Sequence, residues 1–293
     1  MKKEELFAYT AGYADGDGCF TISKHNGYYR ASFYIVSTYK SVIVFFKERL
    51  RGACLTKKRD ENRHNDKTTY HFVLTSDKAV ELAEKLLPFL IEKRKQAQCL
   101  IDFHKSTNKL VKDQYITKMK TLKKEEDFIC KKHIETLKEI KETVCSKKID
   151  FAYLAGFIDA ECSLGIYKHK PKNRINPKFK QTLQLSNTKF PCFEFLSRRF
   201  GGSFTFSKIT KDCHHDIMRY KLSSKKLRDI LPKIHPFLKN KKKVCEELIK
   251  FNELFKRETR CKHSGQFMPL TYSQLEAREK IRNKINHLNT RGC

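Results

Sequence analysis

The chain has 293 residues, enough for one large or two modest domains with a substantial core. Its 62 lysines and arginines outnumber 33 acidic residues, and the resulting formal net charge of +29 favours a polyanionic partner such as nucleic acid over an anionic lipid surface. No apolar run reaches the roughly 18 residues of a membrane span, and "MKKEELFAY" lacks the apolar core of a signal peptide, so neither a transmembrane nor an exported protein is expected.

The first part of the chain is predicted to alternate helices with pairs of strands. A helix is expected over 3–16 and strands over 18–25 and 28–37, with a turn at Asn26-Gly27. Further along we expect a helix at 39–50, strands at 53–59 and 68–75, and helices at 76–87 and 91–105.

The segment 108–147 is rich in lysine and glutamate and has apolar residues at helical spacing, namely Ile134, Leu137, Ile140 and Val144. This pattern predicts a solvated, partly helical linker.

Residues 148–257 repeat the first 107 residues. "YTAGYADGDG" (9–18) returns as "YLAGFIDAEC" (153–162), "VSTYKSVIVFFKERLRG" (36–52) aligns without gaps on 185–201, and "PFLIEKRKQAQCLIDF" (88–103) matches 236–251. The offsets are 144, 149 and 148 residues, so the chain is a duplication with repeats at 1–107 and 148–257. In the tail 258–293, Ser273 with Glu276 predicts a capping box and a final helix.

A stripe of small side chains runs along the opening helix of each repeat. At every fourth position the stripe presents Ala8, Gly12 and Gly16 in the first helix, and Ala152, Gly156 and Ala160 in the second. Such a stripe lets two helix backbones approach closely, so we expect the two helices to pack on each other.

Each opening helix ends on a carboxylate, Asp17 or Glu161, where the helix dipole is already negative. Two carboxylates and several carbonyl groups that converge form a site for a hard divalent cation such as Mg²⁺. Magnesium beside a basic surface suggests phosphodiester hydrolysis. The alternative is that the two acids merely terminate helices.

One face of each predicted sheet is polar. In 28–37 the residues Ala31, Phe33 and Ile35 alternate with polar neighbours, and 178–186 alternates in the same way. An ordinary solvated face has the same pattern, but the net charge favours DNA in the major groove. The candidate DNA contacts are Ser23, His25, Arg30, Ser32, Tyr34, Tyr167, His169, Lys178, Lys180, Thr182, Gln184, Arg219 and Lys221.

The eleven cysteines are scattered, and no C-x-x-C pair occurs. "CHH" (213–215) and "CKH" (261–263) have no partner at zinc-site spacing, so we expect reduced, mostly buried thiols and no structural zinc.

"TAGYADGDG" and "LAGFIDAEC" resemble the signature of the LAGLIDADG homing endonucleases, in their single-chain, two-motif form. The resemblance implies an α+β fold of two pseudo-symmetric αββαββα repeats, with a saddle of two four-stranded antiparallel sheets and the motif helices at the central interface. It also implies a monomeric, intron-encoded, Mg²⁺- or Mn²⁺-dependent enzyme. Such an enzyme cuts both strands of a long asymmetric DNA target across the minor groove and leaves short 3′ overhangs.

By position in the motif, the resemblance makes Asp17 and Glu161 the metal-binding acids and the carbonyl groups of Gly16 and Ala160 their co-ligands. Cys162 replaces the final glycine of the second motif, a departure that we expect to be tolerated.

The resemblance also places Lys93 and Lys241, each five residues after the proline of a "PFL" segment, near the active site. Alternatively they only add to the general positive field. At the end of the second strand of each repeat, Asn187 and Thr38 would order water, although Thr38 is shorter than the usual residue.

Two other functions fit the same sequence, an RNA maturase that binds its host intron and a catalytically inactive DNA-binding protein. The Lys-rich, Trp-free composition is associated with A+T-rich genomes such as those of mitochondria or chloroplasts, which favours an intracellular, organellar protein.

Overall fold

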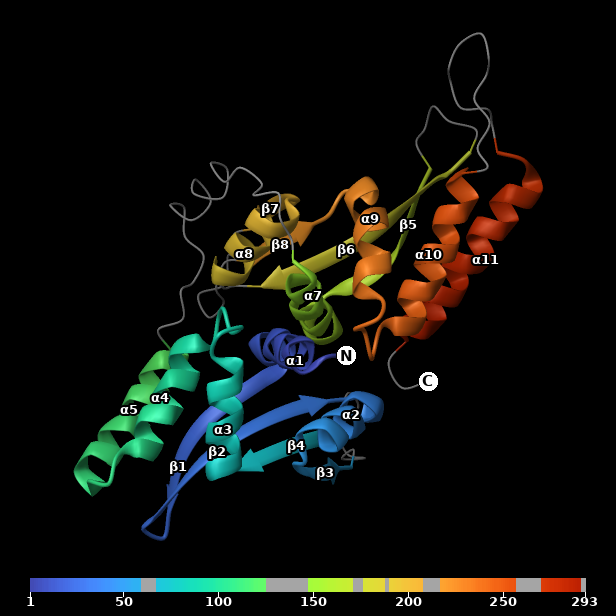
Figure 1. Ribbon diagram of the computed structural model, residues 1–293. Coiled ribbons are helices and arrows are strands. Elements are labelled where there is room, and N and C mark those ends of the chain that lie inside the picture. The colour runs from blue at the N-terminus through green and yellow to red at the C-terminus, as the bar shows by residue number, and fades with distance from the viewer. Residues whose placement is uncertain are drawn as a thin grey trace.

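The computed structural model of the chain describes residues 1–58, 67–124, 147–170, 176–187, 190–207, 217–256 and 270–290. Two halves of similar build meet at a central pair of helices (Figure 1). The first half contains α1 (Lys3–Asp17), β1 (Gly18–His25), β2 (Tyr28–Ser37), α2 (Lys40–Leu50), β3 (Ala53–Lys57), β4 (Thr69–Thr75), α3 (Asp77–Leu86), α4 (Arg94–Lys105) and α5 (Lys109–Lys124). The second half contains α7 (Lys148–Glu161), β5 (Ser163–His169), β6 (Lys178–Asn187), α8 (Phe190–Phe200), β7 (Ser203–Ser207), β8 (Ile217–Lys221), α9 (Ser224–Ile234), α10 (Lys242–Lys256) and α11 (Tyr272–Asn289).

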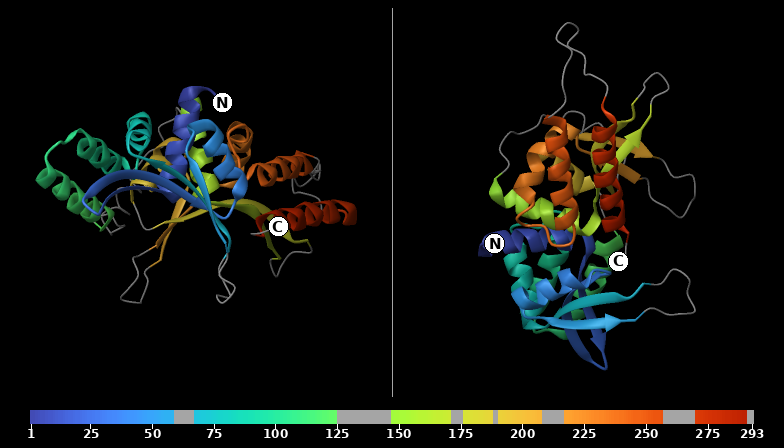
Figure 2. Two further views of the ribbon diagram at one scale, coloured as in Figure 1. Left: turned by 90° about the horizontal axis from the view of Figure 1, so that it is seen from below. Right: turned by 90° about the vertical axis from the view of Figure 1, so that its right-hand side faces the viewer.

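Each half has a four-stranded antiparallel sheet of the same topology, in the order β1-β2-β4-β3 and β5-β6-β8-β7. Alternate residues of the strands are buried under helices, as Phe33 and Ile35 of β2 and Leu183 and Leu185 of β6 show. The helices gather on one side of both sheets, and the opposite faces spread as a saddle (Figure 2). The predicted two-repeat α+β fold is therefore confirmed.

The register of the duplication differs by one residue from the ungapped sequence alignment. The helices α2 and α8 are displaced by 150 residues at both ends, where the alignment predicts 149. Arg51 and Gly201, which both have left-handed φ angles (56° and 63°), are therefore equivalent. So are Gly52 and Gly202, where a Cβ would overlap the ring of Phe72 or Tyr220. The ungapped alignment is wrong here because it matches Gly52 with Gly201. Gly52 leaves room for the ring of Phe72, whereas Gly201 has a left-handed φ angle.

The duplication extends through one more helix in each half. The pairs α4–α5 and α10–α11 are helical hairpins, and α5 lies against the edge strand β1 as α11 lies against the edge strand β5. Lys24 on β1 is bonded to Asp113 on α5 (2.9 Å), and Lys168 on β5 pairs with Glu279 on α11 (2.7 Å). These hairpins cover strand edges that would otherwise expose unpaired backbone groups.

The start of α11 corrects one prediction. Its N-cap is Thr271, whose hydroxyl accepts a hydrogen bond from the Gln274 N–H (3.3 Å), so Ser273 and Glu276 do not form the capping box. The segment predicted as a linker contains α5, and its four predicted apolar helix positions lie outside the described residues. No helix in the described part of the chain is long and apolar enough to cross a membrane.

Candidate active site

The two motif helices α1 and α7 pack backbone to backbone at the centre of the molecule. A Cβ on Gly12 would overlap the carbonyl oxygen of Tyr153, and one on Gly156 would overlap that of Tyr9. Only glycine permits this approach at these two positions. The predicted central interface between the motif helices is thus present.

The interface continues to the C-terminal ends of both helices. A Cβ on Gly16 would lie 2.5 Å from the Cβ of Ala160 and 2.9 Å from the Cγ of Glu161. Asp17 and Glu161 are the last residues of their helices, and both side chains are exposed, whereas the motif residues before Gly16 and Ala160 are buried. The fold therefore brings the two helix ends together and leaves both carboxylates accessible to a ligand.

Two other carboxylates of the motifs, Asp15 and Asp159, are buried, with exposed fractions of 1% and 2%. Asp15 accepts hydrogen bonds from the backbone N–H groups of Ile91 and Lys93 (both 2.8 Å) and from the Tyr153 hydroxyl (2.7 Å). Because Ile91 and Lys93 bond to this side chain, residues 91–93 form a bend, and α4 begins at Arg94 and not at the predicted residue 91.

Asp159 repeats this arrangement in the second half. It accepts hydrogen bonds from the backbone N–H groups of Lys239 (2.6 Å) and Lys241 (2.8 Å) and from the Tyr9 hydroxyl (2.8 Å). Burial raises the pKa of both aspartates, while the hydrogen bonds that they accept act in the opposite direction. Each of the two aspartates therefore accepts three hydrogen bonds, two from backbone N–H groups and one from a tyrosine hydroxyl, as an ionised carboxylate can.

Lys93 and Lys241 lie at the C-terminal ends of the motif helices. The Lys93 ammonium donates to the carbonyl oxygens of Ala14 (2.7 Å), Gly16 (2.9 Å) and Gly18 (2.8 Å), and its side chain is buried. The Lys241 ammonium donates to the carbonyl oxygens of Ile158 (2.5 Å) and Asp159 (3.0 Å). Both lysines thus place positive charge against the negative ends of the helix dipoles, a specific position that a general surface field does not require.

The sheet register changes which residue of the first repeat is equivalent to Asn187. Cys19 pairs with Tyr34 and Ser163 with Gln184, which makes Ser37 the equivalent of Asn187. Thr38, which the ungapped alignment selects, lies one residue beyond the end of β2.

Ser37 is buried and lies on the side of the sheet that faces the motif helix α1. Burial raises the pKa of Tyr13, and the nearby side chains of Ser37 and Asn240 oppose that rise. The Tyr13 hydroxyl is buried and makes no hydrogen bond of normal geometry within the described residues.

The predicted DNA contacts all lie on strands of the two sheets, at positions that alternate with the core residues. Arg30, Lys180 and Arg219 are exposed, Tyr34 and Gln184 are half-buried, and Ser32 has an exposed fraction of only 6%. The remaining candidates are exposed at Ser23, His25, Tyr167, His169 and Lys221, and half-buried at Lys178 and Thr182. The uncovered faces of both sheets are therefore polar and carry more basic than acidic side chains.

The donor set at the helix ends suits a hard cation. Asp17 and Glu161 are exposed carboxylates, and Gly16 and Ala160 have carbonyl groups at half-exposed positions, of which the Gly16 carbonyl oxygen also accepts a hydrogen bond from the Lys93 ammonium. Burial raises the pKa of Cys162 to about 12, so in the absence of a metal ion this thiol stays protonated at neutral pH.

No cluster of three or more His, Cys, Asp or Glu side chains is placed to bind a metal within the described ranges. The six cysteines in those ranges are free thiols, while "CHH" and "CKH" lie outside them.

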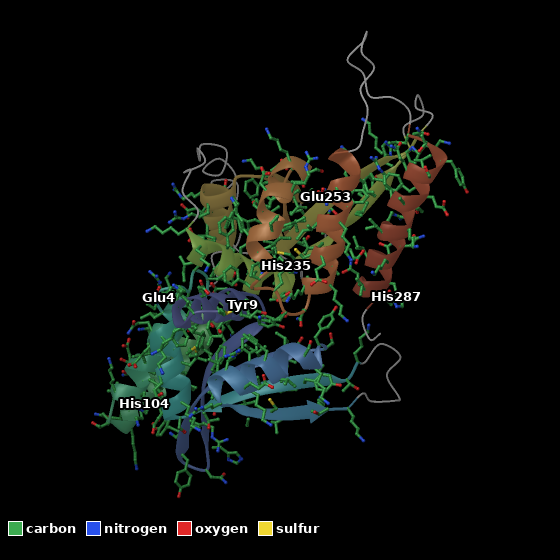
Figure 3. All side chains as sticks on the ribbon, turned by 45° about the vertical axis from the view of Figure 1, so that its right-hand side comes forward. Glu4, Tyr9, His104, His235, Glu253 and His287 are labelled. Atoms are coloured by element: carbon green, nitrogen blue, oxygen red, sulfur yellow. The ribbon has the colours of Figure 1, made fainter. Side chains whose placement is uncertain are left out.

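Sequence reasoning missed Asp15, Asp159, Tyr9 and Tyr153. A signal was present, because each tyrosine and each aspartate recurs at the same offset of 144 residues as Asp17 and Glu161. Tyr9 lies on α1 near the junction of the two halves in Figure 3.

No protein-family model and no curated protein matches the chain. Its structure is similar to that of the LAGLIDADG meganuclease I-AabMI bound to uncleaved DNA, with 18% identity, a TM-score of 0.64, and coverage of 94% of this chain and 98% of that one. It is also similar to the meganuclease I-SmaMI bound to uncleavable DNA (17% identity, TM-score 0.65, coverage 97% and 100%). The homing endonuclease I-LtrWI bound to target DNA has 17% identity, a TM-score of 0.63 and coverage of 96% and 97%. The chain thus has the LAGLIDADG homing endonuclease fold over nearly its whole length.

Proposed function

We propose that the chain is a site-specific double-stranded DNA endonuclease with one shared catalytic centre. The observation that carries this proposal is the pair of exposed carboxylates, Asp17 and Glu161, at helix ends packed against each other between two polar sheet faces. The similar solved structures are bound to DNA, which supports the substrate class.

Asp17 and Glu161, with the carbonyl oxygens of Gly16 and Ala160, would hold Mg²⁺ or Mn²⁺. Such an ion, when bound, supplies Lewis-acid stabilisation of negative charge on the oxygens of a scissile phosphate. One similar structure, I-SmaMI, is bound to uncleaved DNA in the presence of calcium ions, which supports a divalent cation here.

The chain's own residues supply positioning and charge. Lys93 and Lys241 hold the carbonyl groups of the motif helix ends and keep a positive charge next to the reaction centre, where it would stabilise developing negative charge. Asn187 would order water in the second half, and the sheet register favours Ser37 over Thr38 for this role in the first half.

The open sheet faces would bind the major groove on either side of the cut. Arg30, Lys180 and Arg219 have the donors that pair with guanine, and Gln184 can pair with adenine. Because the faces of the two halves differ in sequence, we infer a long asymmetric target. The two motif helices already pack on each other within one chain, so a monomer suffices for two half-sites.

The test is to incubate the protein with a random-sequence duplex library and Mg²⁺ and to sequence the cut ends. We expect one long non-palindromic consensus, cut in both strands at closely spaced positions. A consensus recovered by binding but never cut would support the inactive DNA-binding alternative. Selective binding of an intron transcript without cleavage of any duplex would support the maturase alternative.

A further inference from the structure

Each motif helix carries one tyrosine whose hydroxyl donates to a buried carboxylate of the other half. Tyr9 on α1 donates to the Asp159 Oδ2 atom on α7 (2.8 Å), and Tyr153 on α7 donates to the Asp15 Oδ2 atom on α1 (2.7 Å). We call Tyr9 and Tyr153 the tyrosine pair. Each hydroxyl therefore crosses the interface, and the two links are reciprocal.

Both hydroxyls of the tyrosine pair remain hydrogen-bond donors at neutral pH. Both side chains are buried, with exposed fractions of 0% and 4%. Burial, together with the neighbouring carboxylate, raises the pKa of each tyrosine well above its usual value. Each hydroxyl consequently stays protonated and acts as a donor to its carboxylate.

Each buried carboxylate also holds the loop that carries the lysine of its own half. Asp15 binds the backbone of Ile91 and Lys93, and Lys93 in turn binds the carbonyl groups around Asp17. In the second half Asp159 binds the backbone of Lys239 and Lys241, and Lys241 binds the carbonyl groups of Ile158 and Asp159 in the last turn of the motif helix. The hydrogen bonds of the tyrosine, the buried aspartate and the lysine thus lead from one half to backbone carbonyl groups near the end of the motif helix in the other half.

We propose that Tyr9 and Tyr153 are positioning residues that act across the interface. Tyr153, from the second half, sets the geometry of the Lys93 and Asp17 side of the centre, and Tyr9, from the first half, sets that of the Lys241 and Glu161 side. This arrangement couples the two halves of the centre, so that neither side is correctly formed unless the halves are docked. An effect of the tyrosines on strand cleavage rests on the proposed function, whereas their effect on the loops 91–93 and 239–241 does not.

The first experiment measures amide hydrogen exchange of the free protein and involves no DNA. Tyr153→Phe should speed exchange of the Ile91 and Lys93 amides about ten-fold or more, as expected when one hydrogen bond to a charged acceptor is lost, and leave Lys239 and Lys241 unchanged. Tyr9→Phe should give the reverse. The matched control is Tyr220→Phe, which removes a buried hydroxyl that donates to the Gly201 carbonyl group, and it should affect neither loop.

The second experiment follows nicking of each strand of a cleavable target under single-turnover conditions. Tyr9→Phe and Tyr153→Phe should each slow one strand at least about ten-fold more than the other, with opposite strand preference, while Tyr220→Phe should show no strand preference. Equal acceleration of exchange in both loops, or a change confined to the tyrosine's own half, would overturn the proposal. If exchange changes as expected but no strand is cut by the parent, the tyrosine coupling stands and the proposed endonuclease function fails.

Discussion

Neighbouring carboxylates in the same motif differ in burial. Asp15 and Asp17 are two residues apart, yet Asp15 is buried with three donors while Asp17 is exposed at the helix end. The sequence analysis selected Asp17 as the carboxylate at the helix end but assigned no place to Asp15, because a motif rich in acids and small residues does not show which other side chain faces the protein interior. In the structure, Asp15 is buried where α1 packs on α7, and Asp17 is exposed.

This difference in burial predicts different responses to the same substitution. In Asp15→Asn the new amide group would face N–H and O–H donors, so we expect a loss of about 1–3 kcal/mol in the free energy of unfolding. Asp17→Asn changes an exposed side chain and should stay within about 0.5 kcal/mol of the parent. Urea unfolding at neutral pH measures both. Equal stability of the two variants would show that the Asp15 contacts contribute nothing.

The lysines lead to a kinetic prediction. Lys93→Met combined with Lys241→Met should depress single-turnover cleavage ten-fold or more, about 1.4 kcal/mol, because positive charge is removed from both helix ends at the centre. The exposed Lys124→Met serves as the control for the general field. Cleavage at the parental rate with only weaker binding would mean that these lysines act as scaffold charges.

At the scale of elements, the stripe of small residues and the alternating strands were predictable because both are local periodic patterns. The one-residue shift in register was not, because an ungapped alignment cannot show which of two adjacent glycines lies under an aromatic ring. The equivalence of α5 and α11 was also missed. Their sequences have diverged, and only their common position against an edge strand relates them.

The close packing of α1 on α7 predicts a steep cost for a single methyl group. Gly12→Ala should destabilise the protein by about 1–3 kcal/mol or more, because the new Cβ overlaps a backbone carbonyl group that cannot move aside easily. Gly165→Ala on β5, where the nearest atom lies at 3.8 Å, is the matched control and should be nearly neutral. Thermal unfolding of both variants measures the difference, and we expect a lower melting temperature for Gly12→Ala. Similar melting temperatures would contradict the backbone-to-backbone interface.

The docking of α11 should depend on pH. Burial alone would raise the pKa of Glu279, but hydrogen bonds from Lys168 and Arg282 lower it below its usual value of 4.5. Because the folded-state pKa is lowered, the stabilisation is present above pH 4.5 and is lost as the pH falls through the folded-state pKa. The protection factors of the α11 amides, which compare the exchange rate with the intrinsic rate at the same pH, should therefore fall selectively in acid. Glu279→Gln should remove part of the pH dependence of protection in α11. The same pH dependence in this variant as in the parent would contradict the role of Glu279.

For the molecule as a whole, the duplication explains the location of the proposed centre. Neither half contains a complete set of groups, because each motif supplies one exposed carboxylate and each buried carboxylate takes one donor from the other half. The fold and this central location followed from the repeated motif. The connections between the halves depend on side-chain contacts over 138 and 150 residues of sequence separation, which no local pattern predicts.

The most direct measurement of the central claim compares binding and cleavage of the selected target by the parent, Asp17→Asn and Glu161→Gln in Mg²⁺. Both substituted side chains are exposed, so folding and DNA binding should be retained, and we predict target affinity within a few-fold of the parent. Double-strand cleavage should be abolished in both variants. Full cutting by either variant in Mg²⁺ would contradict a shared catalytic centre built by the two motif helices.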